Sequence, residues 1–236
     1  MKNSLCIHHH LGLGDHFDCN GMVRYIMEKN SFYKVYVFSK SNYFNMIKYM
    51  YRDDDKIEVV KIDKDKNEIA QVEAFLKDTE PEFFLKVGFD KYPPPHELAQ
   101  NKNCWEYFYE QVKIPYNVRT DYFYVERDLE EETRLLGKLN PDGGSFLFMH
   151  DDPSRGYTMN RDVFSSGVSV IENDNSENIF HFIKILEEAE EIHCMESSFK
   201  SLIDFYSKTP SLYYHDFRNQ PLGEKTNRQW STVSYD

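Results

Sequence analysis

The sequence predicts an α/β protein in which parallel sheets are covered by helices. Two observations lead to this fold class. First, apolar runs typical of strands alternate with amphipathic stretches typical of helices along most of the chain. Second, the spacing leaves room for one helix between successive strands, which is the connection that parallel strands require. The alternation breaks once, near residue 140, and then resumes, so we expect two such units.

The first half of the chain opens with an apolar strand, Leu5-Cys6-Ile7, which runs into three histidines and a turn with two glycines. The helix that follows places Met22 and Ile26 on one face, as helical periodicity requires. Three adjacent prolines at 93–95 interrupt the alternation and predict a loop. The other elements of this half are expected as strands at 34–38, 56–62 and 83–87 and as helices at 43–51, 68–76, 105–111 and about 128–139.

The clearest break in the chain is Asn140-Pro141-Asp142-Gly143-Gly144, and we place a domain boundary there. This gives an N-terminal domain of residues 1–140 and a C-terminal domain of residues 141–236. We expect two Rossmann-like halves that face each other, with a ligand in the cleft between them. The second half is expected to hold strands at 146–149, 168–171, 191–195 and 212–214, helices at 177–189 and from residue 196, and a final polar tail.

Composition and charge exclude several classes of protein. A length of 236 residues with 40% hydrophobic and 16% aromatic residues provides a real core, so global disorder is not expected. The net charge of −12 argues against nucleic acid as the main partner, because binding phosphates requires clustered Lys and Arg. No stretch approaches the roughly 18 apolar residues of a membrane span. We therefore expect a cytoplasmic protein that does not span a membrane.

The turn after the first strand concentrates groups that can take up or release protons. Asp15 and His16 follow the two glycines and are candidate catalytic residues. A strand that breaks at such a turn into a helix directs backbone N–H groups toward a ligand above the sheet. Gly12-x-Gly14 is not the dinucleotide fingerprint, because the third glycine is replaced by Phe17. The alternative is an ordinary helix start, in which Asp15 complements the helix dipole.

A second group of polar residues, His150 to Tyr157, follows a buried strand of the second half. Ligands of open α/β sheets bind at such carboxyl ends. The guanidinium of Arg155 could contact two oxygens of a diphosphate, and the glycine after it would allow the backbone to approach a ligand. The alternative is a polar loop with an internal Asp–Arg pair. Asp151 and Asp152 point opposite ways if they continue the strand, so we expect no metal.

A third group is Glu196-Ser197-Ser198-Phe199-Lys200, where a strand ends and a helix begins. Its hydroxyls and unpaired helix N–H groups could bind an anion. The alternative is that the serines simply cap the helix. Two other polar stretches are expected to be structural: Asp53-Asp54-Asp55 as a solvated loop, and the pair His193-Cys194 as core.

Taken together, these motifs resemble those of GT-B glycosyltransferases. The resemblance rests on His-x-Gly-Leu-Gly-Asp-His at 10–16, Asn-Gly-x-x-Arg at 20–24, His-Asp-Asp-x-Ser-Arg-Gly at 150–156 and Glu-Ser-Ser-Phe at 196–199. Bacterial and viral members related to heptosyltransferases and the fucosyltransferase-like group are the most similar. The resemblance implies an acceptor site in the N-terminal half and a nucleotide-sugar site in the C-terminal half, without a metal or other cofactor.

Carried over to this sequence, the resemblance implies that Asp15 acts as general base, that Arg155 contacts the donor diphosphate, and that Ser197 and Ser198 lie near its phosphates. The full set of implied donor-binding residues is His150, Asp152, Arg155, Glu196, Ser197, Ser198 and Lys200. The implied acceptor-binding residues are His10, Gly12, Gly14 and Arg24.

The function predicted from the sequence is metal-independent transfer of a hexose or deoxyhexose. The sugar would move from a nucleotide-diphosphate sugar to a hydroxyl of a glycan or other acceptor, so these two molecules are the expected partners. Asp15, or His16 in its place, would remove the hydroxyl proton. Two alternatives stay open: a hydrolase of nucleotide sugars or phosphate esters, and a glycan- or nucleotide-binding module without catalytic activity.

Overall fold

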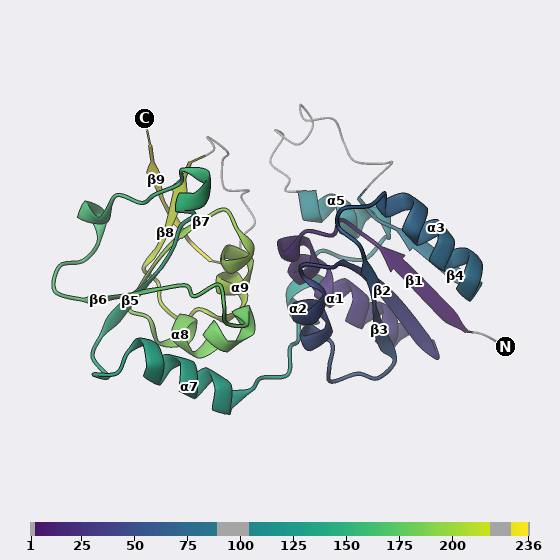
Figure 1. Ribbon diagram of the computed structural model, residues 1–236, viewed down its shortest axis with the longest axis horizontal. Coiled ribbons are helices and arrows are strands. Elements are labelled where there is room, and N and C mark those ends of the chain that lie inside the picture. The colour runs from purple at the N-terminus through teal and green to yellow at the C-terminus, as the bar shows by residue number, and fades with distance from the viewer. Residues whose placement is uncertain (1–2, 89–103, 218–227, 236) are drawn as a thin grey trace. The chain divides into compact units, whose positions relative to one another are not determined.

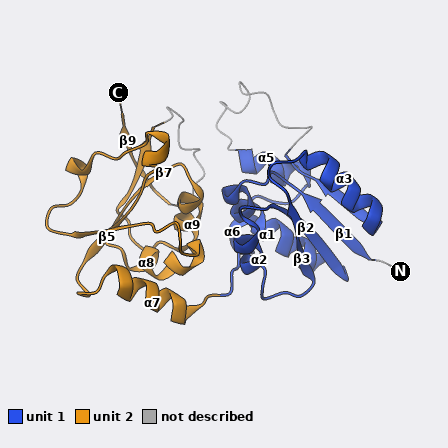
Figure 2. Cartoon of the chain, in the orientation of Figure 1, with its two compact units in different colours: residues 1–126 blue, residues 127–236 orange. Residues whose placement is uncertain are grey.

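The computed structural model describes residues 3–88, 104–217 and 228–235, so the proline-rich loop predicted at 93–95 lies outside the described residues. The chain forms two compact units, residues 1–126 and 127–236 (Figure 2). The division falls before the boundary expected at residue 140. The reason is that helix α7 (Leu129–Leu139) packs against η3 (Ile179–Phe182) and α8 (Ile183–Glu188), and therefore belongs to the second unit.

Unit 1 is built on a four-stranded parallel sheet of order β3-β2-β1-β4 (Figure 1). This is the order of the first four strands of a Rossmann fold. Its strands are β1 (Ser4–His8), β2 (Lys34–Lys40), β3 (Ile57–Ile62) and β4 (Phe83–Lys86), and its helices are α1 (Leu13–Lys29), α2 (Phe44–Met50), α3 (Glu68–Thr79), α5 (Cys104–Gln111) and α6 (Val118–Asp121).

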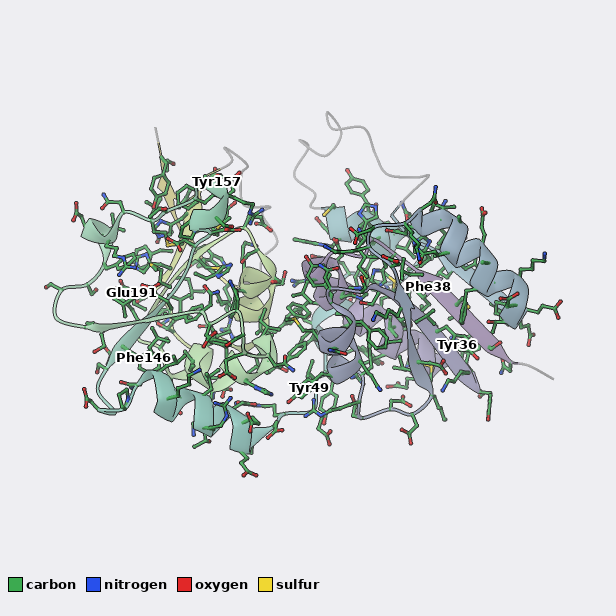
Figure 3. All side chains as sticks on the ribbon, viewed as in Figure 1. Tyr36, Phe38, Tyr49, Phe146, Tyr157 and Glu191 are labelled. Carbon is green, nitrogen blue, oxygen red and sulfur yellow. The ribbon has the colours of Figure 1, made fainter. Side chains whose placement is uncertain are left out.

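Aromatic and apolar side chains attach helices to both faces of this sheet. Phe75 of α3 contacts the rings of Tyr36 and Phe38 on β2, at centroid distances of 5.2 and 5.4 Å. Tyr36 and Phe38 are labelled in Figure 3. On the other side, buried residues of α1, α5 and α6 form one cluster with Val87. The Tyr109 hydroxyl joins α5 to α1, because it donates to the Asp18 carbonyl at 2.8 Å. Helix α1, which carries Asp15, is therefore held from several sides.

Unit 2 is built on a five-stranded parallel sheet of order β6-β5-β7-β8-β9. Numbered within the unit, this is the doubly wound order 2-1-3-4-5. Helix α7 packs against η3 and α8, α8 packs against η3 and α9, and α9 packs against β7. The strands are β5 (Phe146–His150), β6 (Ser169–Glu172), β7 (Glu191–Met195), β8 (Leu212–Asp216) and β9 (Ser231–Ser234), and the remaining helices are η1 (Pro153–Arg155), η2 (Arg161–Val163) and α9 (Ser198–Tyr206).

The predicted α/β class with two Rossmann-like units is confirmed. One prediction for the C-terminal end is wrong: the expected polar tail contains β9, which pairs in parallel with β8 from Ser231 to Ser234. The sequence Ser-Thr-Val-Ser has no apolar run because β9 is a mostly exposed edge strand. No helix in the described part of the chain is both long and apolar enough to cross a membrane.

Candidate functional site

Each of the two sheets has one position at which a ligand is expected to bind. In open parallel sheets, ligands bind at the carboxyl ends of the strands where the strand order reverses. In unit 1 this point lies between β1 and β4, and in unit 2 between β5 and β7. The segments that follow β1, β5 and β7 carry most of the residues predicted for the site. His150 pairs with Cys194 in the ladder, so the two segments of unit 2 leave neighbouring strand ends.

Asp15 lies in the first turn of α1, partly exposed, directly after the carboxyl end of β1. The indole Nε1 of Trp105 donates to its Oδ1 at 3.1 Å. Gly12 makes room for the other oxygen, since a Cβ at position 12 would lie only 2.6 Å from Oδ2. An acid in this position is also favoured by the helix dipole. The carboxylate is thus held in one orientation at the sheet edge, as a general base must be.

His16 and His9 lie beside Asp15 but inside the protein. Their rings meet edge to face at a centroid distance of 4.6 Å, and both side chains are fully buried. Burial lowers the pKa of His9 to about 4 and the pKa of His16 well below its usual value, so both are neutral near pH 7. Within the described residues, neither ring nitrogen of His16 has a hydrogen-bond partner. His16 has no contact with solvent, which leaves Asp15 as the better placed proton acceptor.

The same edge of unit 1 holds further charged residues that the sequence motifs do not include. Nε2 of His8 lies 2.9 Å from Oε1 of Glu68, which begins α3, and Nζ of Lys40, at the end of β2, lies 3.5 Å from its Oε2. Burial is the largest influence on His8 and lowers its pKa, whereas Glu68 opposes this effect. His10 is partly buried, with its ring 5.1 Å from that of Phe108.

Arg24, a predicted acceptor-binding residue, lies away from this edge. Its guanidinium donates to both carboxylate oxygens of Asp53 at 2.8 Å and to the Met50 carbonyl at 3.1 Å. Asp53 lies in an exposed turn before β3, at the amino edge of the sheet, as expected, and it pairs there with Arg24. Gly21 is needed because a Cβ would lie 2.4 Å from the Val118 carbonyl. The Asn-Gly-x-x-Arg motif is therefore structural.

In unit 2, His150 ends β5 and lies at the switch point. Its Nδ1 is 2.7 Å from Oδ1 of Asn173, and its ring is 4.6 Å from that of Phe199. Burial lowers its pKa. The next residue, Asp151, accepts a hydrogen bond from the Met159 amide at 3.0 Å and so fixes the loop that follows. Asn173 follows β6 and was not among the predicted residues, because no local motif marks it.

Arg155 and Asp152 form the internal pair that was the alternative for this loop. Nε of Arg155 lies 2.5 Å from Oδ2 of Asp152, and the Ser154 hydroxyl donates to Oδ1 at the same distance. These two hydrogen bonds lower the pKa of Asp152. The Arg155 side chain is still 50% exposed and lies over the ring of Tyr157. It therefore remains accessible to an anion in solution.

The Glu196–Lys200 segment divides into an accessible part and a buried part. Ser197 occupies the cap position of α9, but its side chain makes no capping hydrogen bond; its Oγ lies 3.7 Å from Sγ of Cys194. Ser197 and Ser198 are partly exposed. Lys200 is buried, with Nζ 3.9 Å from Glu196 and 3.8 Å from Asp204. Its charge balances these acids inside the unit, so it is not placed like a ligand-binding residue.

A chain of hydrogen bonds crosses the middle of the unit 2 sheet. Nε2 of His193 lies 2.6 Å from Glu191, Nδ1 lies 2.8 Å from His215, and His215 in turn contacts the Tyr235 hydroxyl. His193 and Cys194 are fully buried, so the prediction that they belong to the core is confirmed. Within the described residues, no group of three or more His, Cys, Asp or Glu side chains is arranged to hold a metal ion.

Comparisons with known proteins give a match in structure but not in sequence. Neither protein-family models nor curated proteins match the chain. A structure of a glycosyl transferase family 9 protein from Veillonella parvula DSM 2008 matches with a TM-score of 0.62 at 8% identity, covering 100% of this chain and 87% of that one. The E. coli ADP-heptose lps heptosyltransferase II matches with a TM-score of 0.56 at 8% identity, covering 99% and 90%.

A third structure, the E. coli heptosyltransferase WaaC with ADP, matches with a TM-score of 0.50 at 10% identity, covering 99% of this chain and 93% of that one. Each match covers both units of this chain. The similarity to GT-B glycosyltransferases that the motifs suggested is therefore confirmed at the level of the fold.

Proposed function

We propose that this protein is a glycosyltransferase that moves a sugar from a nucleotide-diphosphate sugar to a hydroxyl of a glycan or other acceptor. In this proposal unit 1 binds the acceptor and unit 2 binds the donor. The likeness of the whole chain to glycosyltransferase structures supports the reaction class. The single observation that carries the mechanism is the orientation of Asp15 at the strand-order reversal of unit 1.

Asp15 supplies the general base of the proposed reaction. Its carboxylate takes the proton of the acceptor hydroxyl while the hydroxyl oxygen forms a bond to the anomeric carbon. The bond from that carbon to the diphosphate breaks at the same time, and its electron pair leaves with the nucleoside diphosphate. His16 would be a poorer base, since burial keeps its imidazole away from any acceptor. A carboxylate held by Trp105 needs no rearrangement before it accepts the proton.

The donor diphosphate is assigned to the switch point of unit 2. Ser197 and Ser198 begin α9, where unpaired N–H groups and the helix dipole favour an anion. Arg155 adds a positive charge. Its guanidinium can leave Asp152 and bind the phosphates of the leaving group instead. Stabilising the leaving group in this way is an electrostatic contribution to catalysis. His150, Asp152 and Glu196 surround these groups, whereas Lys200 is left out of the proposed site.

The first experiment is a thermal-shift screen with nucleoside diphosphates and their sugars, because a ligand that binds the folded state raises the melting temperature. ADP is tested first, since one matching structure contains it. We expect at least one nucleotide to bind and the Arg155→Ala variant to bind it more weakly. If Arg155→Ala leaves the affinity for every nucleoside diphosphate unchanged, Arg155 has no part in donor binding.

The second experiment measures sugar transfer by Asp15→Asn. We expect transfer to fall by about 10²- to 10⁴-fold, the usual contribution of a general base. Nucleotide binding should persist, because Asp15 and the proposed donor site belong to different units. Asp78→Asn, which changes an exposed acid of α3, is the matched control and should keep full activity. Release of free sugar without an acceptor would instead indicate a hydrolase, and binding without turnover would indicate a non-catalytic module.

A further inference from the structure

The buried histidines of unit 2 belong to a chain of hydrogen bonds that the proposed reaction does not use. His193 and His215 lie on the neighbouring strands β7 and β8, at most 1% exposed, with Nδ1 of His193 2.8 Å from Nε2 of His215. On one side, Nε2 of His193 lies 2.6 Å from Oε1 of Glu191. On the other, Nδ1 of His215 contacts the hydroxyl of Tyr235, which directly follows β9. Polar groups buried this deeply need partners, and each of these has one.

The protons of this chain follow one order. Burial alone would raise the pKa of Glu191, but hydrogen bonds from Ser165 and His193 lower it overall, so its carboxylate only accepts. Nε2 of His193 therefore carries a proton. Because burial lowers the pKa of both histidines, each ring carries a single proton near pH 7. His215 then donates from its Nε2, and its Nδ1 accepts from the hydroxyl of Tyr235.

The hydroxyl of Tyr235 connects this chain to the loop that carries Arg155. With its proton directed to the histidine, the hydroxyl oxygen accepts the amide N–H of Asn160 at 3.2 Å. The preceding loop is closed, because Asp152 and Tyr157 exchange backbone hydrogen bonds of 2.9 and 3.0 Å. Arg155 lies within this closed loop, in η1. The chain of hydrogen bonds thus ends on the backbone of the segment that presents Arg155.

The ring of Tyr235 reaches the same loop by a second route. It stacks on the ring of Phe217 at a centroid distance of 4.2 Å, and the Phe217 ring lies 5.4 Å from that of Tyr157. The Arg155 guanidinium in turn lies 5.4 Å from the centre of the Tyr157 ring. Contacts between rings, and between a ring and a guanidinium, favour particular geometries. The stack therefore limits the positions open to the Arg155 side chain.

We propose that Tyr235 is a positioning residue that holds Arg155 where it can bind the donor diphosphate. Its hydroxyl, oriented by the two histidines, acts on the backbone at Asn160, and its ring acts through Phe217 and Tyr157. This inference rests on the proposed function, in which Arg155 contacts the phosphates. A side chain that is ordered before the ligand arrives binds more tightly, because less conformational freedom is lost on binding.

Hydrogen exchange tests the positioning without any ligand. Tyr235→Phe removes the hydroxyl and keeps the ring, so the amides of Arg155 and Asn160 should exchange about five- to tenfold faster relative to those of β5 and β7. Tyr213→Phe is the matched control. It removes a hydroxyl outside the chain of hydrogen bonds and keeps a ring that stacks on His193 at 4.6 Å. Equal exchange in Tyr235→Phe and the unchanged protein would overturn the proposal.

The order of the protons has a spectroscopic signature. NMR of the unchanged protein at pH 7 should show the proton on Nε2 of both His193 and His215, and a proton on Nδ1 of either ring would overturn this order. Glu191→Gln keeps an oxygen that accepts from His193, so exchange in the loop should stay close to that of the unchanged protein. Glu191→Met removes this acceptor and should speed exchange as Tyr235→Phe does. Equal exchange in the two Glu191 variants would overturn the role of the histidines.

Nucleotide affinity tests the consequence for the proposed donor site. In titration calorimetry with ADP, or with the nucleoside diphosphate that the thermal-shift screen selects, Tyr235→Phe should weaken binding about three- to tenfold. It should add no further loss to a protein that already carries Arg155→Ala. Unchanged affinity in Tyr235→Phe, or an equal loss with and without Arg155, would overturn the proposal. If the unchanged protein binds no nucleotide, the proposed donor site fails, and hydrogen exchange alone decides whether Tyr235 holds Arg155.

Discussion

A buried ion pair of unit 1 and a group of exposed ion pairs of unit 2 place charged residues in two different environments. Unit 1 buries an ion pair: Nε of Arg119 lies 2.5 Å from Oδ1 of Asp18, and both side chains are at most 3% exposed. Unit 2 has buried pairs as well, but it also carries ion pairs of α7 at the surface. There Arg134 is 43% exposed and contacts Glu131 and Glu177. Arginine–carboxylate ion pairs thus occur in this protein both shielded from solvent and exposed to it.

The difference shows which charges hold the candidate site in place. A buried carboxylate without a partner is far more costly than an exposed one, because water cannot replace the missing charge. Asp18 lies one turn of α1 beyond Asp15, and Arg119 belongs to α6. The pair therefore fixes the helix that carries the proposed base. The surface pairs of α7 are each available to solvent and constrain the fold weakly.

The largest effect is expected from breaking the buried pair. Arg119→Met should lower the free energy of unfolding by about 3–5 kcal/mol, because it leaves the Asp18 carboxylate uncompensated inside unit 1. Chemical denaturation at pH 7, followed by hydrogen exchange in α1, measures this loss. Since natural domains are stable by only about 5–15 kcal/mol, unit 1 could unfold outright.

The double variant Asp18→Leu with Arg119→Met is the control for this prediction. It removes both charges together, so much of the stability lost in Arg119→Met should return. If Arg119→Met alone is as stable as the unchanged protein, then Asp18 is not held by Arg119 and the contrast between the buried pair and the exposed pairs is wrong.

A smaller effect is expected from acid, through the buried histidines of unit 1. An unfolded histidine has a pKa of about 6.5, whereas His9 has a pKa of about 4 when folded. Below pH 6.5 the unfolded chain therefore binds a proton that the folded chain does not. Stability is complete above that pH and falls as the pH decreases toward 4. His9 alone should account for about 2 kcal/mol between pH 7 and pH 5.

His16→Leu separates this effect from the titration of acids. The pKa of His16 is also lowered by burial, and its ring nitrogens have no hydrogen-bond partner in the described residues. The variant should be at least as stable as the unchanged protein at pH 7, because a buried polar group without a partner is unfavourable. It should lose less stability between pH 7 and pH 5. An equal loss in both proteins would mean that His16 is protonated in the folded state.

The sequence predicts the fold and the strand ends at which the candidate residues lie, but it does not predict which side chains contact those residues. Alternating apolar runs indicate the parallel strands, and residues after β1, β5 and β7 lie at strand ends wherever the sheets form. The contacts that orient these residues come from distant segments. Trp105 is 90 positions from Asp15, and Arg119 is 101 positions from Asp18. The local sequence pattern does not predict such contacts, because only the tertiary fold brings these residues together.

Arg24 and Lys200 show the opposite limit of sequence-based prediction: residues predicted to bind a ligand contact carboxylates of the protein instead. Both belong to motifs that run into a helix, and the resemblance to GT-B glycosyltransferases implied that they bind ligands. In the structure Arg24 contacts Asp53 and Lys200 lies between two acids. A lysine or arginine on a helix presents the same sequence pattern whether it meets a ligand or an internal carboxylate. The position of the nearest carboxylate decides between these two roles, and that position depends on the tertiary fold.

The smallest effect is expected at the surface of unit 2. Arg134→Met should leave the unfolding midpoint unchanged within measurement error, because water and nearby cations can replace an exposed ion-pair partner. Arg127→Met is the matched comparison. Arg127 lies two residues before α7 and contacts Glu132, whose side chain is fully buried. Arg127→Met should lower the unfolding midpoint clearly, because it removes the positive charge beside the buried Glu132 carboxylate. Equal midpoints for the two variants would show that burial does not set the strength of these pairs.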